Sequence, residues 1–175
     1  MLYKKIISSL IFSVFTFFII ASAENAPNEN SGIKVMTFED LKPLLDKKTD
    51  TTYVVNFWAT WCAPCIAEIP YFEEVGEKYK DKKLKILMVS LDFPSHIKSR
   101  LIPFMKKENM KNEVVLLDDP NSNRWIPLVD KDWSGAIPAT LIYNDCKRKF
   151  YPNEFTSNEL HTVVEEFIND SVSAE

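Results

Sequence analysis

Two cysteines separated by two residues are the part of this sequence best suited to chemistry. Cys62 and Cys65 enclose the dipeptide Ala63-Pro64. Cysteines at this spacing can interconvert between a dithiol and a disulfide. The remaining cysteine, Cys146, lies far along the chain in a polar stretch that predicts a turn. We expect Cys146 to be a free surface thiol outside the reactive pair.

The elements predicted on either side of the pair favour a reactive thiolate. Residues 51–58 are β-branched and aromatic without charge, which predicts a buried central strand, and residues 64–80 have the spacing of an amphipathic helix. The pair would therefore lie at a helix N-terminus, where free amide N–H groups and the helix dipole favour thiolate over thiol. We expect Cys62 to be the exposed nucleophile and Cys65 the more buried cysteine that resolves a mixed disulfide.

Three other interpretations of the pair have weaker support. A zinc site needs a second pair of ligands, which Cys146 and the distant His96 and His161 do not supply. A structural disulfide would close a loop too short to stabilise the fold much. Binding of Cu(I) by two thiolates stays open as an alternative, although no histidine or methionine of the kind such sites usually add neighbours the pair.

Composition excludes several classes of function. The chain has 175 residues, enough for one domain, with 46% hydrophobic and 26% charged residues as in globular proteins. Its three glycines are not spaced as in a nucleotide-binding loop. The formal charge is −4, and basic residues form only short lysine runs, so nucleic-acid binding has little electrostatic support. We expect no bound cofactor and no metal.

The N-terminal residues predict export. Two lysines precede an uncharged apolar run over residues 6–20, and Ala21-Ser22-Ala23 places small residues where a signal peptidase cleaves. The run is shorter than the roughly 20 residues of a membrane-spanning helix. We predict a signal peptide at residues 1–23, a flexible tether at residues 24–32 and one folded, periplasmic domain at residues 33–175. An uncleaved segment would instead anchor the protein to a membrane.

Strand and helix patterns alternate along the domain. Strands are predicted at residues 33–36, 51–58, 84–91 and 114–117, and a hairpin at 139–143 and 148–151. Helices are predicted at residues 37–47, 64–80, 95–109 with a kink at Pro103, 123–128 and 157–169. This alternation predicts an α/β domain in which helices cover both faces of a central sheet.

The residues around the pair resemble the active-site segment of the thioredoxins. Residues 56–65 read NFWATWCAPC, and the continuation IAEIP at residues 66–70 resembles the TlpA/ResA branch of exported, usually membrane-tethered thiol–disulfide oxidoreductases. The resemblance covers nearly all of residues 33–168. It implies a thioredoxin fold with a central mixed β-sheet and helices on both faces. Residues 93–115 match the extra helix–strand insertion of the TlpA/ResA branch.

The resemblance also implies further site residues. Trp61 precedes the nucleophile as in thioredoxins, and Ile137-Pro138 matches the family's cis-proline, which presents backbone groups to a substrate chain. The buried aspartate that serves the resolving cysteine of thioredoxins is replaced by Asn56, which cannot titrate. Glu68 matches a buried glutamate of the ResA-like branch, so we expect it to accept the proton of Cys65. The alternative is a solvated glutamate on the helix surface.

Together these features predict an exported reductase of protein disulfides. Strong oxidants need a group such as a cation that stabilises the thiolate of their reduced form, and the dipeptide Ala63-Pro64 holds none. The resemblance is also to a reducing branch. Such a reductase needs a membrane electron donor to re-reduce its CxxC. In the family the substrate is often an apocytochrome, as in cytochrome c maturation, or a copper-site protein. We expect a monomer, and a peroxidase is disfavoured because no Thr-x-x-Cys occurs.

Overall fold

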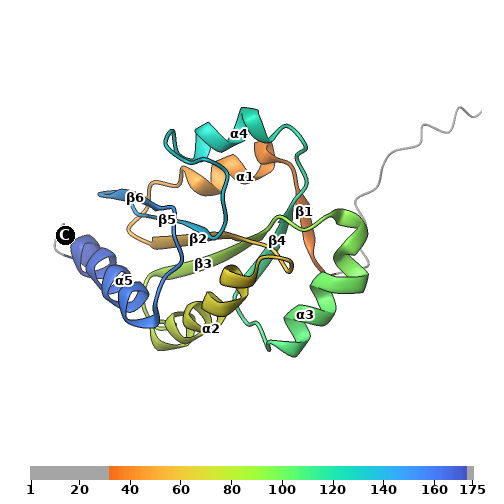
Figure 1. Cartoon of the computed structure of the whole chain (residues 1–175). Helices are drawn as coiled ribbons and strands as arrows, with labels where there is room; N and C mark the ends of the chain where they lie inside the picture. Colours follow the sequence, from red (N-terminus) through yellow and green to blue (C-terminus); the bar gives the residue numbers. More distant parts are fainter. Residues whose placement is uncertain (1–31, 173–175) are drawn as a thin grey trace, which may run out of the picture.

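Six strands form one mixed β-sheet at the centre of the protein (Figure 1). The computed structural model describes residues 32–172, so the predicted signal peptide and nearly all of the tether lie outside the described residues. The strands are β1 (Lys34–Met36), β2 (Thr52–Trp58), β3 (Leu84–Ser90), β4 (Glu113–Leu117), β5 (Ala139–Tyr143) and β6 (Arg148–Tyr151). Their order across the sheet is β1-β4-β3-β2-β5-β6.

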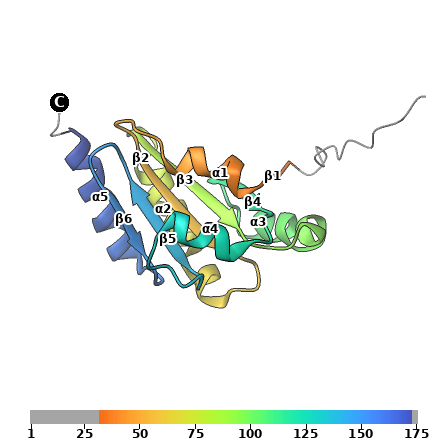
Figure 2. The same ribbon diagram turned by 90° about the horizontal axis from the view of Figure 1, so that it is seen from above.

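Helices cover both faces of this sheet, as predicted (Figures 1 and 2). The α-helices are α1 (Phe38–Leu45), α2 (Ala63–Lys78), α3 (Ile102–Lys107), α4 (Ser122–Val129) and α5 (Ser157–Val172). Apolar side chains of α2, α3 and α5 pack with one face of the sheet, and those of α1 and α4 pack with the other. The sheet therefore separates two hydrophobic cores.

The central strand β2 is buried on both faces, and the chain segment that follows it holds the cysteine pair. All seven of its side chains are buried. Successive side chains of a strand point to opposite faces, so Val54 packs into the core under α2 while Val55 packs into the core under α1. β2 pairs parallel with β3 and antiparallel with β5, which fixes its position from both edges. The chain leaves β2 at Trp58 and enters α2 directly afterwards, at the carboxyl edge of the sheet.

The predicted start of α1 is confirmed in detail. The backbone N–H of Asp40 donates to the Thr37 hydroxyl at 3.4 Å, and the N–H of Thr37 donates to the Asp40 carboxylate at 3.0 Å. These reciprocal bonds satisfy two amide groups that have no partner inside the helix. The same carboxylate accepts two bonds from Thr37, and they lower the pKa of Asp40.

The prediction of one continuous helix at residues 95–109 is wrong. The chain instead forms a short 3₁₀ turn, η1 (Pro94–His96), then a π-helical segment, η2 (Ile97–Leu101), and only then α3. Pro103 lies in the first turn of α3 and does not kink a helix interior. Proline has no N–H to bond to the carbonyl four residues earlier and is tolerated where a helix begins. Pro103 therefore belongs to the start of α3 and is not a kink inside a longer α-helix.

The predicted insertion at residues 93–115 is present as η1, η2, α3 and the first part of β4. β4 lies between β1 and β3 and pairs parallel with both. The insertion therefore widens the sheet on the side of β1. The antiparallel hairpin of β5 and β6 closes the other side, with the bounds that the sequence predicts.

Candidate active site

Cys62 and Cys65 form a disulfide at the N-terminus of α2. Cys62 is the N-cap residue, and its Sγ accepts a hydrogen bond from the backbone N–H of Cys65 at 3.3 Å. A sulfur at this position lies against the amide groups that a helix leaves unpaired, which favours negative charge there. The predicted junction of strand, cysteine pair and helix is confirmed.

Cys62 is less exposed than the sequence suggested. Its exposed fraction is 6%, against 0% for Cys65, so Cys62 is the accessible member of the pair only by a small margin. The chain preceding β5 accounts for part of this shielding, because the carbonyl oxygen of Ile137 lies 3.6 Å from the Sγ of Cys62. The Ile137 segment therefore borders the sulfur that an attacking group must reach.

The segment beside Cys62 is held in place by a buried tryptophan and a glycine. The Ile137-Pro138 bond is cis, as predicted. The indole N–H of Trp133 donates to the Ala136 carbonyl at 2.8 Å, and Trp133 itself packs in the core under α1 and α4. Gly135 has a φ of +88°, a conformation in which a side chain would be strained. Ile137 thus lies beside Cys62 as predicted, whereas the support from Trp133 and Gly135 was not predicted.

Asp92 anchors the loop that leads into the cysteine pair. Its buried carboxylate accepts hydrogen bonds from the backbone N–H of Thr60 at 3.0 Å, from the Thr60 hydroxyl at 2.5 Å and from the Ser90 hydroxyl at 2.9 Å. Charged groups are rarely buried without such partners. Asp92 was not among the residues predicted from the sequence; a signal that could have identified it is its position two residues after the end of β3, the strand that neighbours β2.

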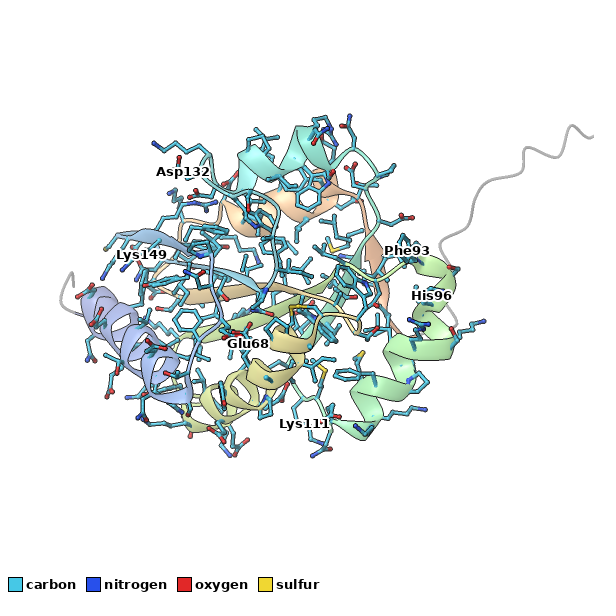
Figure 3. All side chains as sticks on the ribbon, viewed as in Figure 1. Glu68, Phe93, His96, Lys111, Asp132 and Lys149 are labelled. Carbon is cyan, nitrogen blue, oxygen red and sulfur yellow. A yellow bond between two sulfur atoms is a disulfide. The ribbon has the colours of Figure 1, made fainter. Side chains whose placement is uncertain are left out.

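Two exposed aromatic side chains flank the anchored loop. Trp61 is 55% exposed and follows Thr60, and Phe93 is 63% exposed and follows Asp92. The hydrogen bonds between Thr60 and Asp92 therefore hold the two segments that carry these rings together. Figure 3 shows Phe93 at the outer surface of the insertion. Large apolar side chains exposed beside a reactive group are suited to contact another polypeptide.

Glu68 is a buried residue of α2, so the alternative of a solvated helix glutamate is wrong. Its exposed fraction is 1%. Oε1 accepts a hydrogen bond from the Asn56 amide and Oε2 accepts one from the backbone N–H of Phe155, each at 2.8 Å. Burial raises the pKa of Glu68 to about 7, against the opposing effect of these two bonds. A carboxyl with that pKa can accept or release a proton near neutral pH.

Asn56 connects Glu68 to the strand that follows the cis-proline. Its side-chain amide also donates to the Thr140 hydroxyl at 3.0 Å, while its own Oδ1 is buried without a partner among the described residues. Asn56 and Thr140 are directly paired across β2 and β5. In Figure 3 Glu68 points from α2 toward these strands. The Phe155 contact, from the turn before α5, could not be foreseen because 87 residues separate the two positions.

The other candidate groups lie outside this arrangement. Cys146 is free and exposed in the turn between β5 and β6, as expected, and a hydrogen bond from its thiol to neighbouring Asp145 raises its pKa. Within residues 32–172 no group of three or more His, Cys, Asp or Glu side chains is placed to hold a metal ion. The same residues include no helix both long and apolar enough to cross a membrane.

The model of one known protein family matches most of this chain. The model of the AhpC/TSA family matches residues 29–147, which is more than half of the sequence and includes the cysteine pair and the cis-proline. The chain belongs to the AhpC/TSA family. The resemblance to thioredoxin-like oxidoreductases is thus confirmed at the level of family.

Relatives of this AhpC/TSA-family protein include an enzyme named thiol-disulfide oxidoreductase ResA. The ResA of Oceanobacillus iheyensis is 54% identical over 39 residues, which cover 22% of this chain and 20% of that relative. The thioredoxin of Rickettsia prowazekii is 33% identical over 82 residues, covering 43% of this chain and 77% of that protein. The match to ResA therefore concerns about a fifth of its length.

Solved structures share the fold of this AhpC/TSA-family protein. A thiol:disulfide interchange protein of the thioredoxin family from Chlorobium tepidum superposes with a TM-score of 0.58 at 19% identity, over 73% of this chain and 84% of that chain. A secreted disulfide oxidoreductase of Mycobacterium tuberculosis gives a TM-score of 0.53 at 20% identity, over 67% and 83% of the two chains. The predicted thioredoxin-like fold, a mixed sheet with helices on both faces, is confirmed.

Proposed function

We propose that this protein is a thiol–disulfide oxidoreductase that is exported and reduces disulfides of protein substrates. The observation that carries the proposal is the arrangement around one sulfur: Cys62 caps α2, is bonded to Cys65, and faces the Ile137 carbonyl. Membership of the AhpC/TSA family and the names of the relatives support the redox chemistry.

The first step is attack by the Cys62 thiolate on a substrate disulfide. A bond forms between Cys62 Sγ and one substrate sulfur, and the other substrate sulfur leaves as a thiolate. The free amide groups at the start of α2 stabilise the attacking anion. In this proposal an extended substrate chain lies along Ile137 and Pro138, where the backbone carbonyl of Ile137 is available to accept a hydrogen bond, and it contacts the exposed ring of Trp61.

The second step releases the substrate. Cys65 loses its proton and attacks Cys62 Sγ, so the disulfide within the pair forms and the second substrate sulfur leaves with the electron pair. The substrate thereby gains two electrons and two protons, and the enzyme becomes the oxidised form described above. Because Cys65 is fully buried, its proton needs an acceptor inside the protein. Glu68 lies one turn further along α2 and has a pKa of about 7, so it suits this task.

The surroundings of the pair favour a reducing couple. Strong oxidants stabilise their reduced form, chiefly as a thiolate. Here Ala63-Pro64 supplies no positive charge, and an ionised Glu68 in the same helix would disfavour a second anion nearby. The reduced form is therefore poorly stabilised and passes its electrons on readily. A reductase of this kind outside the cytoplasm would be recharged by a membrane electron donor.

Export is proposed from the N-terminal sequence pattern, which lies outside the described residues. It is supported by the name of one structural relative, which is described as secreted. Participation in cytochrome c maturation and a monomeric state stay predictions. The alternative of a Cu(I)-binding protein finds no support in the family or in the relatives named above.

Replacement of each cysteine by serine tests the proposed roles. In an insulin-reduction assay Cys62→Ser should be inactive, whereas Cys65→Ser should accumulate a mixed disulfide that can be seen by mass spectrometry, because Cys62 still attacks and nothing resolves the adduct. Cys146→Ser serves as the matched control and should keep wild-type activity. Adduct formation by Cys62→Ser instead of Cys65→Ser would reverse the roles, and full activity in both variants would refute the proposal.

A further inference from the structure

The charge of the insertion is opposite to that of the rest of the protein. Residues 93–112 contain five basic side chains and one acidic side chain, a formal charge of +4 in a chain whose total is −4. By contrast, α5 contains four acidic residues and no lysine or arginine. Figures 1 and 2 both place α3 and α5 at opposite ends of the molecule. The insertion and α5 therefore carry opposite formal charges at opposite ends of the molecule.

The basic side chains of this insertion are all exposed to solvent. We call residues 93–112 the basic segment; its charges are those of Lys98, Arg100, Lys106, Lys107 and Lys111. All five residues are exposed, whereas Ile97 and Leu101 of the same segment are buried against the sheet. The apolar residues thus face the core, and the charged ones are left in contact with solvent.

Most of these charges have no ion-pair partner among residues 32–172. Lys107 pairs with Glu108 at 2.7 Å. In the part of the chain that the structure describes, the side chains of Lys98, Arg100, Lys106 and Lys111 make no ion pair. Arg124, in contrast, pairs with both Glu39 and Asp119. Unpaired charges of one sign attract a surface of the opposite sign over the distance of a Debye length, about 8–10 Å at physiological salt.

An apolar cavity adjoins the basic segment where the described chain begins. It has a volume of about 390 Å³ and is lined by Ile33 together with Ile102, Met105 and Met110 of the segment. Gly32, the first described residue, also contributes to this lining. Apolar side chains beside lysines are the combination by which surface segments bind the interface of a bilayer, where both the acyl chains and the headgroups are contacted.

The sequence places a hydrophobic run close to this surface. Residues 24–32 separate the start of the folded domain, where Gly32 and Ile33 line this cavity, from the predicted signal or anchor at residues 1–23. Nine residues span at most about 30 Å when fully extended. Whenever residues 6–20 enter a bilayer, the start of the domain is consequently held within about that distance of the headgroups, and the part of the basic segment that shares the cavity with Gly32 is kept near them at a high effective concentration. An acidic protein partner would have no such connection to this end of the chain.

We propose that the basic segment docks on a bilayer surface that contains anionic lipids. Lys98, Arg100 and Lys106 would contact lipid phosphates, while the acidic helix α5 at the other end of the molecule is turned away from them. The segregation of charge thus orients the domain as well as binding it. This inference does not depend on the direction of the redox reaction or on the identity of its substrate.

Binding of the full-length chain to lipid vesicles tests the proposal. Sedimentation should be measured with vesicles of phosphatidylcholine alone and with vesicles that contain about 30% phosphatidylglycerol. Each basic side chain near such a surface strengthens binding about fivefold, so the wild type should bind the anionic vesicles at least about tenfold more tightly. Lys4 and Lys5 can also favour anionic vesicles, so the share of the basic segment is taken from variants that leave residues 1–23 unchanged.

Two variants of equal net charge separate the segment from the overall charge. The test variant combines Lys98→Gln, Arg100→Gln, Lys106→Gln and Lys107→Gln. The control variant neutralises four exposed lysines outside the segment, Lys48→Gln, Lys82→Gln, Lys131→Gln and Lys149→Gln. The test variant should lose most of the preference for anionic vesicles and the control should keep it, while both retain wild-type insulin reduction.

Three results would overturn the proposal. The first is equal binding of the wild type to neutral and anionic vesicles. The second is an equal loss of binding in the two variants, because net charge alone would then explain the attraction. The third is equally tight binding of the wild type to soluble polyglutamate, which would point to an acidic polypeptide as the partner of the basic segment.

Discussion

Burial of Glu68 should make the stability of the oxidised protein depend on pH. The pKa of Glu68 rises from an ordinary 4.5 to about 7 on folding, mainly because the carboxyl is desolvated. One pKa unit corresponds to about 1.4 kcal/mol of differential interaction between the two protonation states. The shift therefore corresponds to about 3 kcal/mol, a large part of the 5–15 kcal/mol that typically separates folded from unfolded states.

The direction of the effect follows from which state holds the proton. Below pH 4.5 Glu68 is protonated in both the folded and the unfolded chain, and its contribution is fully present. Between pH 4.5 and about 7 the unfolded chain loses the proton while the folded protein keeps it, so stability falls as pH rises. Above pH 7 the carboxyl is ionised in both states, and the loss is complete.

Glu68→Gln should remove this pH dependence. Glutamine cannot accept both bonds that Glu68 accepts, because its NH₂ group must face either the Asn56 amide or the Phe155 N–H. An unsatisfied buried donor costs about 1–3 kcal/mol, but that cost is the same at every pH. The free energy of unfolding of the wild type minus that of Glu68→Gln should therefore fall by about 3 kcal/mol between pH 4.5 and 7.5.

Urea unfolding of the oxidised proteins at half-unit pH intervals, followed by circular dichroism, measures this difference. All other titrating groups are common to the two proteins and cancel. Glu74→Gln, an exposed glutamate on the same helix, is the matched control and should follow the wild type within about 0.5 kcal/mol. Parallel stability curves for wild type and Glu68→Gln would show that Glu68 is not a perturbed carboxyl, and the proton acceptor for Cys65 would have to be water.

Three further predictions concern the same region. Glu68→Gln should shift the pH profile of Cys62 alkylation by iodoacetamide to lower pH and slow turnover at neutral pH, because a nearby negative charge and the proton acceptor are both removed; profiles identical to wild type from pH 5 to 9 would contradict this. Gly135→Ala should lower the free energy of unfolding by about 1–3 kcal/mol in urea titrations, since the added Cβ would lie 2.8 Å from Ile126 at a φ of +88°; an unchanged midpoint would exclude strain there. Asn56→Asp should raise the pKa of Glu68 further, moving the pH-dependent loss of stability to higher pH in the same titrations, because it places a second carboxyl beside the first; a shift to lower pH would refute it.

Local sequence patterns were enough to predict the parts of the fold whose residues determine their own conformation. β2 is a run of β-branched and aromatic residues, and the hairpin of β5 and β6 is bounded by a polar turn, so both were predicted to within a residue. The position of Cys62 and Cys65 at the start of α2 followed in the same way. The irregular start of the insertion was not predictable, because π-helical and 3₁₀ turns have no pattern distinct from that of an α-helix.

Contacts between distant segments account for what the sequence did not reveal. The burial of Glu68 depends on a backbone N–H of Phe155 that lies 87 residues away, and the active-site loop depends on Asp92, 32 residues beyond Thr60. Likewise, the lysines of the insertion form short isolated runs in the sequence, and the structure is needed to show that they stay exposed while Ile97 and Leu101 are buried. Side-chain partners of this kind are set by tertiary packing rather than by local sequence.

The reduction potential of the Cys62–Cys65 couple is the most direct test of the proposed function. It can be measured by equilibrating the purified protein with glutathione redox buffers and with thioredoxin, and by trapping the two states with a thiol-specific reagent that changes mass. The absence of a cation in Ala63-Pro64 and the presence of buried Glu68 predict a value nearer the roughly −270 mV of thioredoxin than the roughly −120 mV of DsbA. A value close to that of DsbA would make the protein an oxidant and contradict its assignment as a reductase.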